Sequence, residues 1–340
     1  MSTRLAAGAR VLITGGAGFI GSHLAEALVR GGCRVSVIDN LSTGRFENIR
    51  HLTRDAHFSF AIDSVANEAV LDHLVQDCDL IFHLASAVGV ELIVADPVHV
   101  LESNIFGTRA VLAAANRYLK PICITSTSEV YGKSERVPFA EGDDRLLGPT
   151  TKNRWSYATS KAAIEHLSLA YHQQMDLPVT VVRLFNTVGP RQRGRYGMVI
   201  PRLVRQALAG EKLSVYGDGN QQRCFCDVSD VTRAMIDLAQ HDAAVGRVFN
   251  IGSTREISIR ALAELVLQQV AEHRQQPVPN AGENITLVPY ETVYGKGFED
   301  MRRRLPDISR IQAAIGWQPS IPLEETLRRV IAERAASAAP

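Results

Sequence analysis

The stretch Val11-Leu12-Ile13-Thr14-Gly15-Gly16-Ala17-Gly18-Phe19-Ile20-Gly21 decides the fold. A short aliphatic run of β type leads into a turn with several glycines, and a helical pattern begins at the last of them. Gly15, Gly18 and Gly21 have no side chains, so a pyrophosphate can approach the backbone there, where free N–H groups and the helix dipole favour it. A strand, a glycine-rich turn and a helix in this order predict a dinucleotide-binding site.

Asp39 ends the next β-type run, eighteen residues after Gly21. An acidic side chain at this place accepts a hydrogen bond from the adenosine 2′-hydroxyl and repels a 2′-phosphate. The sequence therefore predicts NAD, in preference to NADP, as the cofactor.

Short apolar runs alternate with helical stretches from Arg10 to about Ile251, which predicts a parallel sheet covered on both faces. The fold class is α/β, a Rossmann-like doubly wound sheet with a smaller C-terminal substrate-binding region. We expect the NAD-binding domain at residues 1–185 plus about 229–253, the substrate domain at 186–228 plus 254–335, and a frayed tail at 336–340. Strands are predicted at 11–14, 34–38, 58–62, 80–84, 121–126, 179–184 and 248–251, and helices at 21–30, 98–118, 157–174, 260–272 and 323–335.

Tyr157 and Lys161 lie four residues apart in a helical stretch, so both side chains point to one face. A nearby ammonium can lower the pKa of a tyrosine from its usual value of about 10, which would prepare the phenol to take a proton from a hydroxyl. Thr127, Ser128 and Glu129 follow an earlier predicted strand, at the carboxyl edge where open α/β sheets bind ligands.

Composition excludes several classes of partner. The 340 residues carry a formal net charge of +1 without a long block of like charge, so nucleic acid is not predicted as a partner. No apolar run approaches a membrane span, and the five cysteines show no zinc-ligand spacing, so neither a membrane nor a metal is predicted. A reducing cytoplasm is the expected location.

The chain resembles the extended short-chain dehydrogenase/reductase family of nucleotide-sugar epimerases, dehydratases and decarboxylases. The resemblance spans about residues 10–335 and rests on the glycine turn, Asp39-Asn40-Leu41-Ser42-Thr43-Gly44, His83-Leu84-Ala85, Asn104, the Tyr157/Lys161 pair and Arg183-Leu184-Phe185-Asn186. It implies NAD as cofactor and a homodimer built from the helices at 98–118 and 157–174. The cofactor residues that it implies are Gly15, Gly18, Phe19, Ile20, Gly21, Asp39, Asn40, Ser42, Thr43, Gly44, Ser64, Val65, Leu84, Ala85, Ser86, Asn104, Tyr157 and Lys161.

The same resemblance implies roles on the sugar side. Thr127 and Tyr157 would act on the C4 hydroxyl, and Lys161 would bind the nicotinamide ribose. Asn186 and Arg223 would hold the diphosphate of the sugar nucleotide. The substrate residues are expected to be Val88, Ser128, Asn186, Arg191, Val199, Arg202, Val215, Tyr216 and Arg223.

The segment from Tyr294-Gly295-Lys296-Gly297-Phe298-Glu299-Asp300 to Arg304-Leu305-Pro306-Asp307 looks like UDP-glucuronate decarboxylases, in which Glu129 and Arg304 would act on the uronic acid. Typical 4-epimerases instead carry an arginine near position 298. The resemblance therefore implies decarboxylation of UDP-glucuronate to UDP-xylose or a 4-keto-pentose. A UDP-sugar or UDP-uronate 4-epimerase is the alternative, and a non-catalytic dinucleotide sensor is a remote third one.

Overall fold

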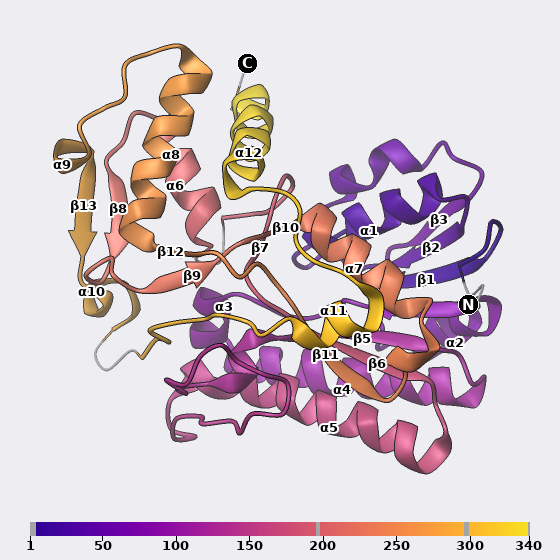
Figure 1. The fold of residues 1–340 in the computed structure, drawn as a ribbon. Helices are drawn as coiled ribbons and strands as arrows, with labels where there is room; N and C mark the ends of the chain where they lie inside the picture. The colour runs from indigo at the N-terminus through magenta and orange to yellow at the C-terminus, as the bar shows by residue number, and fades with distance from the viewer. Residues whose placement is uncertain (1–4, 195–197, 296–298, 339–340) are drawn as a thin grey trace.

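A seven-stranded parallel sheet forms the centre of the molecule in the computed structural model, which describes residues 5–194, 198–295 and 299–338 (Figure 1). The strand order β11-β6-β5-β4-β1-β2-β3 has its crossover between β1 and β4, so the doubly wound α/β fold predicted from the sequence is confirmed. The strands are β1 (Arg10–Thr14), β2 (Arg34–Ile38), β3 (Phe58–Ala61), β4 (Leu80–His83), β5 (Ile122–Thr127), β6 (Val179–Leu184) and β11 (Arg247–Ile251).

Helices cover both faces of this sheet, which explains why its strands are nearly continuous apolar runs. On one face, α1 and α7 pack against residues such as Val11, Ile13 and Phe82, while Leu12, Ile81 and Ile124 face the helices on the other side. The first layer consists of α1 (Phe19–Arg30) and α7 (Val228–Ala239), and the second of α2 (Glu68–Asp77), α4 (Pro97–Arg117) and α5 (Ser156–Met175).

A second, smaller region stands beside the carboxyl edge of the sheet and has its own apolar core. Its helices are α6 (Val199–Leu208), α8 (Ile259–Arg274) and α12 (Leu323–Ala338), together with the short α9 (Ala281–Asn284) and α10 (Tyr290–Tyr294). Its short strands pair as β8 (Leu213–Tyr216) with β13 (Ile285–Val288) and β9 (Gln222–Cys224) with β12 (Glu256–Ser258). The strands β7 (Thr187–Val188) and β10 (Cys226–Asp227) join the two regions.

Two details refine the expected domain limits. The helix α11 (Ser309–Ile315) and Trp317 pack into the core beneath the large sheet, although the sequence places them in the second region. The expected tail is helical as far as Ala338, because the alanine-rich end favours helix and Ser337 donates a hydrogen bond to the Glu333 carbonyl. Residues 339–340 lie outside the described part of the chain.

None of the described helices is both long enough and apolar enough to cross a bilayer.

Candidate active site

A cavity of about 720 Å³ lies between the sheet and the second region. One half is lined by the glycine turn and the ends of β2, β4 and β5, and the other half by side chains from the second region. The cavity therefore has a dinucleotide side and a sugar side, which meet at Tyr157.

The glycine turn is shaped by its contacts with the strand ends around it. Gly15 has a φ of +72°, and a Cβ atom there would lie 2.7 Å from the backbone nitrogen of Ala85. A Cβ atom on Gly21 would overlap the carbonyl oxygen of Gly15. The turn can be this tight only with glycine, and it leaves the start of α1 open toward the cavity.

Asp39 lines the cavity and also supports the turn. Its Oδ2 accepts a hydrogen bond from the backbone N–H of Ala17 at 2.9 Å, and its Oδ1 accepts one from Leu41 at 2.8 Å. Burial raises the pKa of Asp39, although these backbone hydrogen bonds oppose the shift. A carboxylate oxygen has two lone pairs, so Asp39 can still accept hydrogen bonds from ribose hydroxyls.

Most of the predicted cofactor residues line this half of the cavity, but two do not. Gly44 packs behind Asp39, where a Cβ atom would lie 2.8 Å from the carboxylate. Asn104 is buried and holds the loop that follows β4, because its Oδ1 accepts hydrogen bonds from the Ser86 hydroxyl and the Ala87 N–H. The predicted residues that do line it are Gly15, Gly18, Phe19, Ile20, Gly21, Asp39, Asn40, Ser42, Thr43, Ser64, Val65, Leu84, Ala85, Ser86, Tyr157 and Lys161.

His83 ties three elements together beneath the cavity. Its Nδ1 lies 2.7 Å from the Thr14 hydroxyl at the end of β1, and its Nε2 lies 2.9 Å from the Thr108 hydroxyl of α4. Complete burial, with a smaller effect of the Lys161 charge, lowers the pKa of His83 to about 3. The ring is therefore neutral at physiological pH and serves as a fixed bridge.

Tyr157 and Lys161 share one face of α5, as predicted. The Lys161 ammonium donates a hydrogen bond to the Thr125 carbonyl at 3.0 Å, and burial lowers its pKa to about 8. The hydroxyls of Ser86 and Thr127 favour the ionised form of Tyr157 and so act to lower its pKa.

The prediction that Lys161 lowers the pKa of Tyr157 is wrong for this geometry. Burial and then the negative charge of Glu129 raise the pKa of Tyr157 well above its usual value. Lys161 is turned toward the Thr125 carbonyl, with its Nζ 6.0 Å from the centre of the Tyr157 ring.

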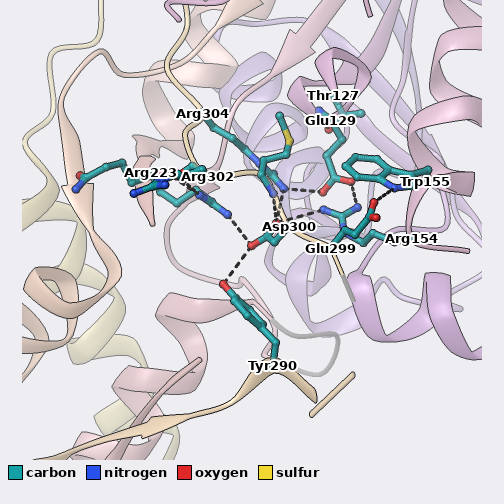
Figure 2. A network of polar contacts seen from close by, with 12 residues as sticks. Thr127, Glu129, Arg154, Trp155, Arg223, Tyr290, Glu299, Asp300, Arg302 and Arg304 are labelled. Carbon is teal, nitrogen blue, oxygen red and sulfur yellow. Dashed lines mark hydrogen bonds and ion pairs between the residues drawn. The ribbon is translucent and has the colours of Figure 1, made fainter. Parts of the chain in front are cut away.

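A cluster of charged side chains forms the sugar side (Figure 2). Arg154 Nη1 lies 2.5 Å from Glu129 Oε2, and Arg304 Nη2 lies 3.3 Å from Glu129 Oε1. Asp300 accepts a hydrogen bond from Arg223 Nη2 at 2.7 Å, and its other oxygen lies 3.7 Å from both Arg154 and Arg304. One network thus connects four segments that are far apart in the sequence.

The segment that carries Asp300 and Arg304 is held across the cavity by its own anchors. The Glu299 carboxylate accepts a hydrogen bond from the Trp155 indole at 2.9 Å and lies 2.6 Å from the Lys133 ammonium. Farther along, the Leu305 carbonyl accepts a hydrogen bond from the Phe139 N–H. These contacts explain how a late segment reaches a site built on β5 and α5.

Within this cluster, three guanidinium groups face two carboxylates. Burial alone would raise the pKa of Glu129, but the charges of Arg154 and Arg304 outweigh it and hold the pKa at about 2. Nε of Arg154 and Nε of Arg304 are buried and have no hydrogen-bond acceptor within the described residues. The cluster therefore combines an excess positive charge with unused donors.

Most of the predicted substrate residues also line the cavity, again with two exceptions. Arg191 turns away, with its Nη2 2.6 Å from Glu26 Oε2, so it is held by α1 instead of facing a ligand. Val215 is fully buried in the core of the second region because its side chain points to the inner face of β8. Those that do line it are Val88, Ser128, Asn186, Val199, Arg202, Tyr216 and Arg223, together with Thr127, Glu129 and Arg304.

Sequence reasoning assigned no role to Arg154, Asp300 or Tyr290, which all line the cavity. Arg154 precedes Tyr157 by three residues, in the short helical turn that leads into α5, and this close spacing was a usable signal. Asp300 and Tyr290 come from irregular or short elements, for which no spacing rule applies. Phe298, the position near which the resemblance expects an arginine in 4-epimerases, lies outside the described residues.

The parallel sheet, the glycine turn and the Tyr157/Lys161 pair define the class of the protein as a short-chain dehydrogenase/reductase. The family model of GDP-mannose 4,6-dehydratase matches residues 12–330, and the chain belongs to this family.

Two curated relatives cover nearly all of the chain. It is 42% identical over 323 residues to the UDP-N-acetyl-alpha-D-glucosaminuronate decarboxylase of Bacillus cytotoxicus, covering 95% of this chain and 96% of that protein. It is 36% identical over 325 residues to UDP-glucuronic acid decarboxylase 1 of Xenopus tropicalis, covering 95% of this chain and 71% of that protein.

Among solved structures, the UDP-glucuronic acid 4-epimerase of Bacillus cereus in complex with UDP-glucuronic acid and NAD is similar, with a TM-score of 0.83 and 27% identity. The likeness covers 96% of this chain and 99% of that one. The predicted family, and with it the prediction of an enzyme, are confirmed. The alternative of a non-catalytic sensor is therefore dropped.

Proposed function

We propose that this protein removes the carboxyl group of a UDP-linked hexuronate through a 4-keto intermediate, with NAD as its cofactor. The charged cluster on the sugar side is the observation that carries this proposal. Three guanidinium groups face two carboxylates there, and two buried N–H donors have no acceptor among the described residues. A sugar carboxylate offers these two donors a charged acceptor, whereas a neutral sugar does not.

The residues on the dinucleotide side fit NAD. The glycine turn leaves backbone N–H groups at the start of α1 open to a pyrophosphate, and Asp39 offers acceptors to ribose hydroxyls. When bound, NAD supplies a hydride acceptor for the sugar C4 and a positively charged ring that favours the phenolate of Tyr157. Lys161, fully buried beside Thr125, is available to bind the nicotinamide ribose.

Tyr157 is positioned to act on the C4 hydroxyl of the sugar. As a phenolate it takes the hydroxyl proton while C4 is oxidised to a ketone, and the hydroxyls of Thr127 and Ser86 favour that phenolate. The ketone lies β to the carboxylate, so the bond between C5 and the carboxylate carbon can break. Carbon dioxide leaves, and the electron pair of that bond stays on the sugar, delocalised onto the C4 oxygen. Thr127 and the protonated Tyr157 stabilise that enolate by donating hydrogen bonds.

Arg304 and Glu129 act on the carboxylate in this proposal. Arg304 has an unused buried Nε–H and orients the carboxylate before it leaves. Glu129 is ionised and lies beside Arg304, so its charge disfavours the bound carboxylate and assists its departure. C5 then takes up a proton, which gives a UDP-4-keto-pentose. This product is released, or C4 is reduced with the hydride that was removed in the first step, which gives UDP-xylose from UDP-glucuronate.

The substituent at C2 of the sugar distinguishes two candidate substrates. UDP-glucuronate is the substrate that the resemblance implied, and the relative from Xenopus tropicalis is named for it. The more similar relative from Bacillus cytotoxicus is named for the 2-acetamido uronate. We therefore include both uronates as candidates.

A 4-epimerase is the second candidate function, supported by the structural likeness to the UDP-glucuronic acid 4-epimerase of Bacillus cereus. It shares the oxidation at C4, after which the 4-keto sugar turns its other face to the hydride and no carbon is lost. The same buried arginines fit a uronate in either reaction, so the product decides between them.

The purified protein should be incubated with NAD and UDP-glucuronate, its 2-acetamido analogue, or UDP-glucose as the neutral control. We expect carbon dioxide and a UDP-pentose or 4-keto-pentose from at least one uronate and no turnover of UDP-glucose, measured by mass spectrometry. Formation of UDP-galacturonate or its 2-acetamido analogue without loss of carbon dioxide would establish the epimerase instead.

We also infer a homodimer through α4 and α5. The exposed face of α4 carries Val98 and Phe106, which are 63% and 60% exposed, together with Ala113. The neighbouring face of α5 exposes Ala163. Small and apolar residues on two packed helices suit close contact with a second copy. Ala163→Glu should convert a dimer into a monomer in analytical ultracentrifugation, whereas Ala336→Glu on α12 should not.

A cytoplasmic location also belongs to this proposal. All five cysteines are buried free thiols, which suits a reducing compartment. Fractionation of cells that contain the tagged protein tests this inference.

A further inference from the structure

Arg154 is the more closely bound partner of Glu129. Its Nη1 lies 2.5 Å from Glu129 Oε2, its side chain is only 4% exposed, and its guanidinium lies 5.4 Å from the centre of the Trp155 ring. It belongs to a short helical turn (Asn153–Trp155) that leads directly into α5. Arg154 is therefore fixed by burial and by its place beside the helix of Tyr157.

Arg304 contacts the same carboxylate more loosely. Its Nη2 is 3.3 Å from Glu129 Oε1 and 3.7 Å from Asp300 Oδ1, so it is shared between two anions and close to neither. Its Nε, like that of Arg154, is buried without an acceptor among the described residues, so the longer distances are what set Arg304 apart. Of the two arginines on Glu129, Arg304 is the one whose contacts a ligand carboxylate can replace at low cost.

If Arg304 leaves Glu129 for a ligand carboxylate, Glu129 loses one of the two cations that keep it ionised. A second cation must then stabilise its negative charge. Glu129 is buried, and burial alone favours its protonated form. Three further charged or titratable groups act near it, namely Asp300 and Arg223 across the cluster and Tyr157 on α5. Arg223 is the positive one among them, but it is hydrogen-bonded to Asp300, so Arg154 is the contacting cation that can keep Glu129 ionised during the exchange.

We propose that Arg154 is a positioning residue that holds Glu129 ionised and in place while Arg304 turns from Glu129 to the carboxylate of the substrate. The proposal rests on the proposed function, because it requires a uronate. It assigns different roles to the two arginines that contact Glu129. Arg304 determines the affinity for the uronate, and Arg154 acts on turnover through Glu129.

The two roles predict different kinetic signatures for the substitutions. Arg304→Gln should raise KM for the uronate by about 10- to 100-fold, since it removes a charge-assisted contact with the substrate. It should leave the affinity for UDP, which lacks the carboxylate, unchanged. Arg154→Gln should keep KM within a few fold and lower kcat by roughly 100-fold, because a displaced carboxylate no longer matches the reacting geometry.

The pH profile and a double substitution test whether Arg154 acts through Glu129. Loss of Arg154 should raise the pKa of Glu129, so the acid limb of kcat should move to higher pH by about 1 to 3 units. Arg154→Lys should restore part of this shift. In a background with Glu129→Gln, the further change Arg154→Gln should lower kcat by less than about threefold, because the two groups act as one unit.

The control variant is Arg303→Gln, which removes an arginine next to Arg304 that pairs with Glu256 on the outside of the cluster. It should behave like the wild type. Each variant should first show an unchanged thermal midpoint and unchanged NADH fluorescence on binding. Arg154→Lys, which keeps the charge, provides the test if Arg154→Gln does not fold.

The outcomes separate this inference from the proposed function. If the wild type releases no carbon dioxide from either uronate, the proposed function fails and the inference fails with it. If the wild type is active, two results would overturn the inference. One is that Arg154→Gln raises KM as much as Arg304→Gln does. The other is that the loss of kcat in the double variant equals the product of the losses in Arg154→Gln and Glu129→Gln. The first of these results would mean that Arg154 itself binds the uronate.

Discussion

The two halves of the cavity are built in different ways. The dinucleotide side comes from the strand ends of one sheet, and its shape depends on backbone contacts such as the approach of Gly15 to Ala85. The sugar side is assembled from charged side chains at positions 129, 154, 223, 300 and 304, which belong to separate segments. One half is determined by local sequence, and the other depends on the complete tertiary fold.

This difference has an energetic side as well. A displaced glycine turn collides with the backbone of the neighbouring strand, which cannot move aside. A displaced arginine can instead adopt another rotamer and pair with another anion. We therefore expect substitutions on the dinucleotide side to affect binding and folding together. Substitutions on the sugar side should change the choice of substrate while the protein stays folded.

The largest effect is expected where the halves meet. Tyr157→Phe removes the hydroxyl that faces Thr127 and Ser86, so kcat should fall by roughly 10²- to 10⁴-fold. NADH binding, measured by fluorescence, should stay within a few fold of the wild type. Tyr171→Phe, in the same helix but partly buried against the core and away from the cavity, is the matched control. Turnover retained by Tyr157→Phe would show that another group is the base.

The next largest effect tests the backbone-determined half. Gly15→Ala places a Cβ atom 2.7 Å from the Ala85 nitrogen at a φ of +72°, so NADH affinity should fall at least about tenfold and the free energy of unfolding by roughly 1–3 kcal/mol. Gly210→Ala has a similar φ of +70° but no atom within 4 Å of the added Cβ. It should leave NADH binding intact, and equal losses in the two variants would attribute the effect to φ alone.

A moderate effect is expected from the one side chain on which this half depends. Asp39→Ala removes acceptors for the ribose, so the affinity for NAD should fall by roughly 10- to 100-fold. Discrimination against NADP should fall too, because the negative charge is gone. Titration with both cofactors measures this, with the exposed Asp55→Ala as control. Unchanged NAD/NADP selectivity would show that Asp39 only supports the glycine turn.

The smallest effect concerns stability at the boundary between the halves. The folded pKa of Lys161, about 8, is below the ordinary 10.5, so between these values the unfolded chain binds the additional proton. Stability therefore rises with pH through this window, and below pH 8 the buried charge is a cost of up to roughly 3 kcal/mol. Lys161→Met should be more stable than the wild type at pH 7 by about 2 kcal/mol, after about 1 kcal/mol for the lost hydrogen bond to Thr125. Denaturant unfolding at pH 7 and pH 10.5 measures the difference, which should shrink at the higher pH.

Sequence alone predicted the sheet and the dinucleotide side well because both follow from local patterns. Gly15, Gly21 and Asp39 lie within one strand-turn-helix-strand unit, and that unit folds in only one way. The exceptions are instructive, since Gly44 and Asn104 support the site from behind and do not line it. The spacing of residues in the sequence does not show whether a residue contacts the ligand or only stabilises the residues that do.

The sugar side was predicted only in part. Thr127 and Glu129 were found from their place after a predicted strand, and Arg304 was found through the resemblance. The contact of Arg154 with Glu129 and the bridging position of Asp300 depend on the tertiary fold. Arg191 was expected to face the substrate, but it does not line the cavity, because its guanidinium pairs with the carboxylate of Glu26 on α1. The pKa of Tyr157 was predicted in the wrong direction, since four-residue spacing does not reveal where the lysine ammonium points.

His83 links the glycine strand, β4 and α4 through a ring that must stay neutral. In the unfolded chain its pKa returns to the ordinary 6.5, against about 3 when folded, so acidification across this interval protonates the unfolded form first. By linkage, each step downward in pH therefore weakens the folded state. His83, which links the strands beneath the cavity, therefore also makes the folded protein sensitive to acid. Mild acidification should unfold the protein and release a bound dinucleotide. The release is irreversible if the unfolded chain aggregates before it refolds.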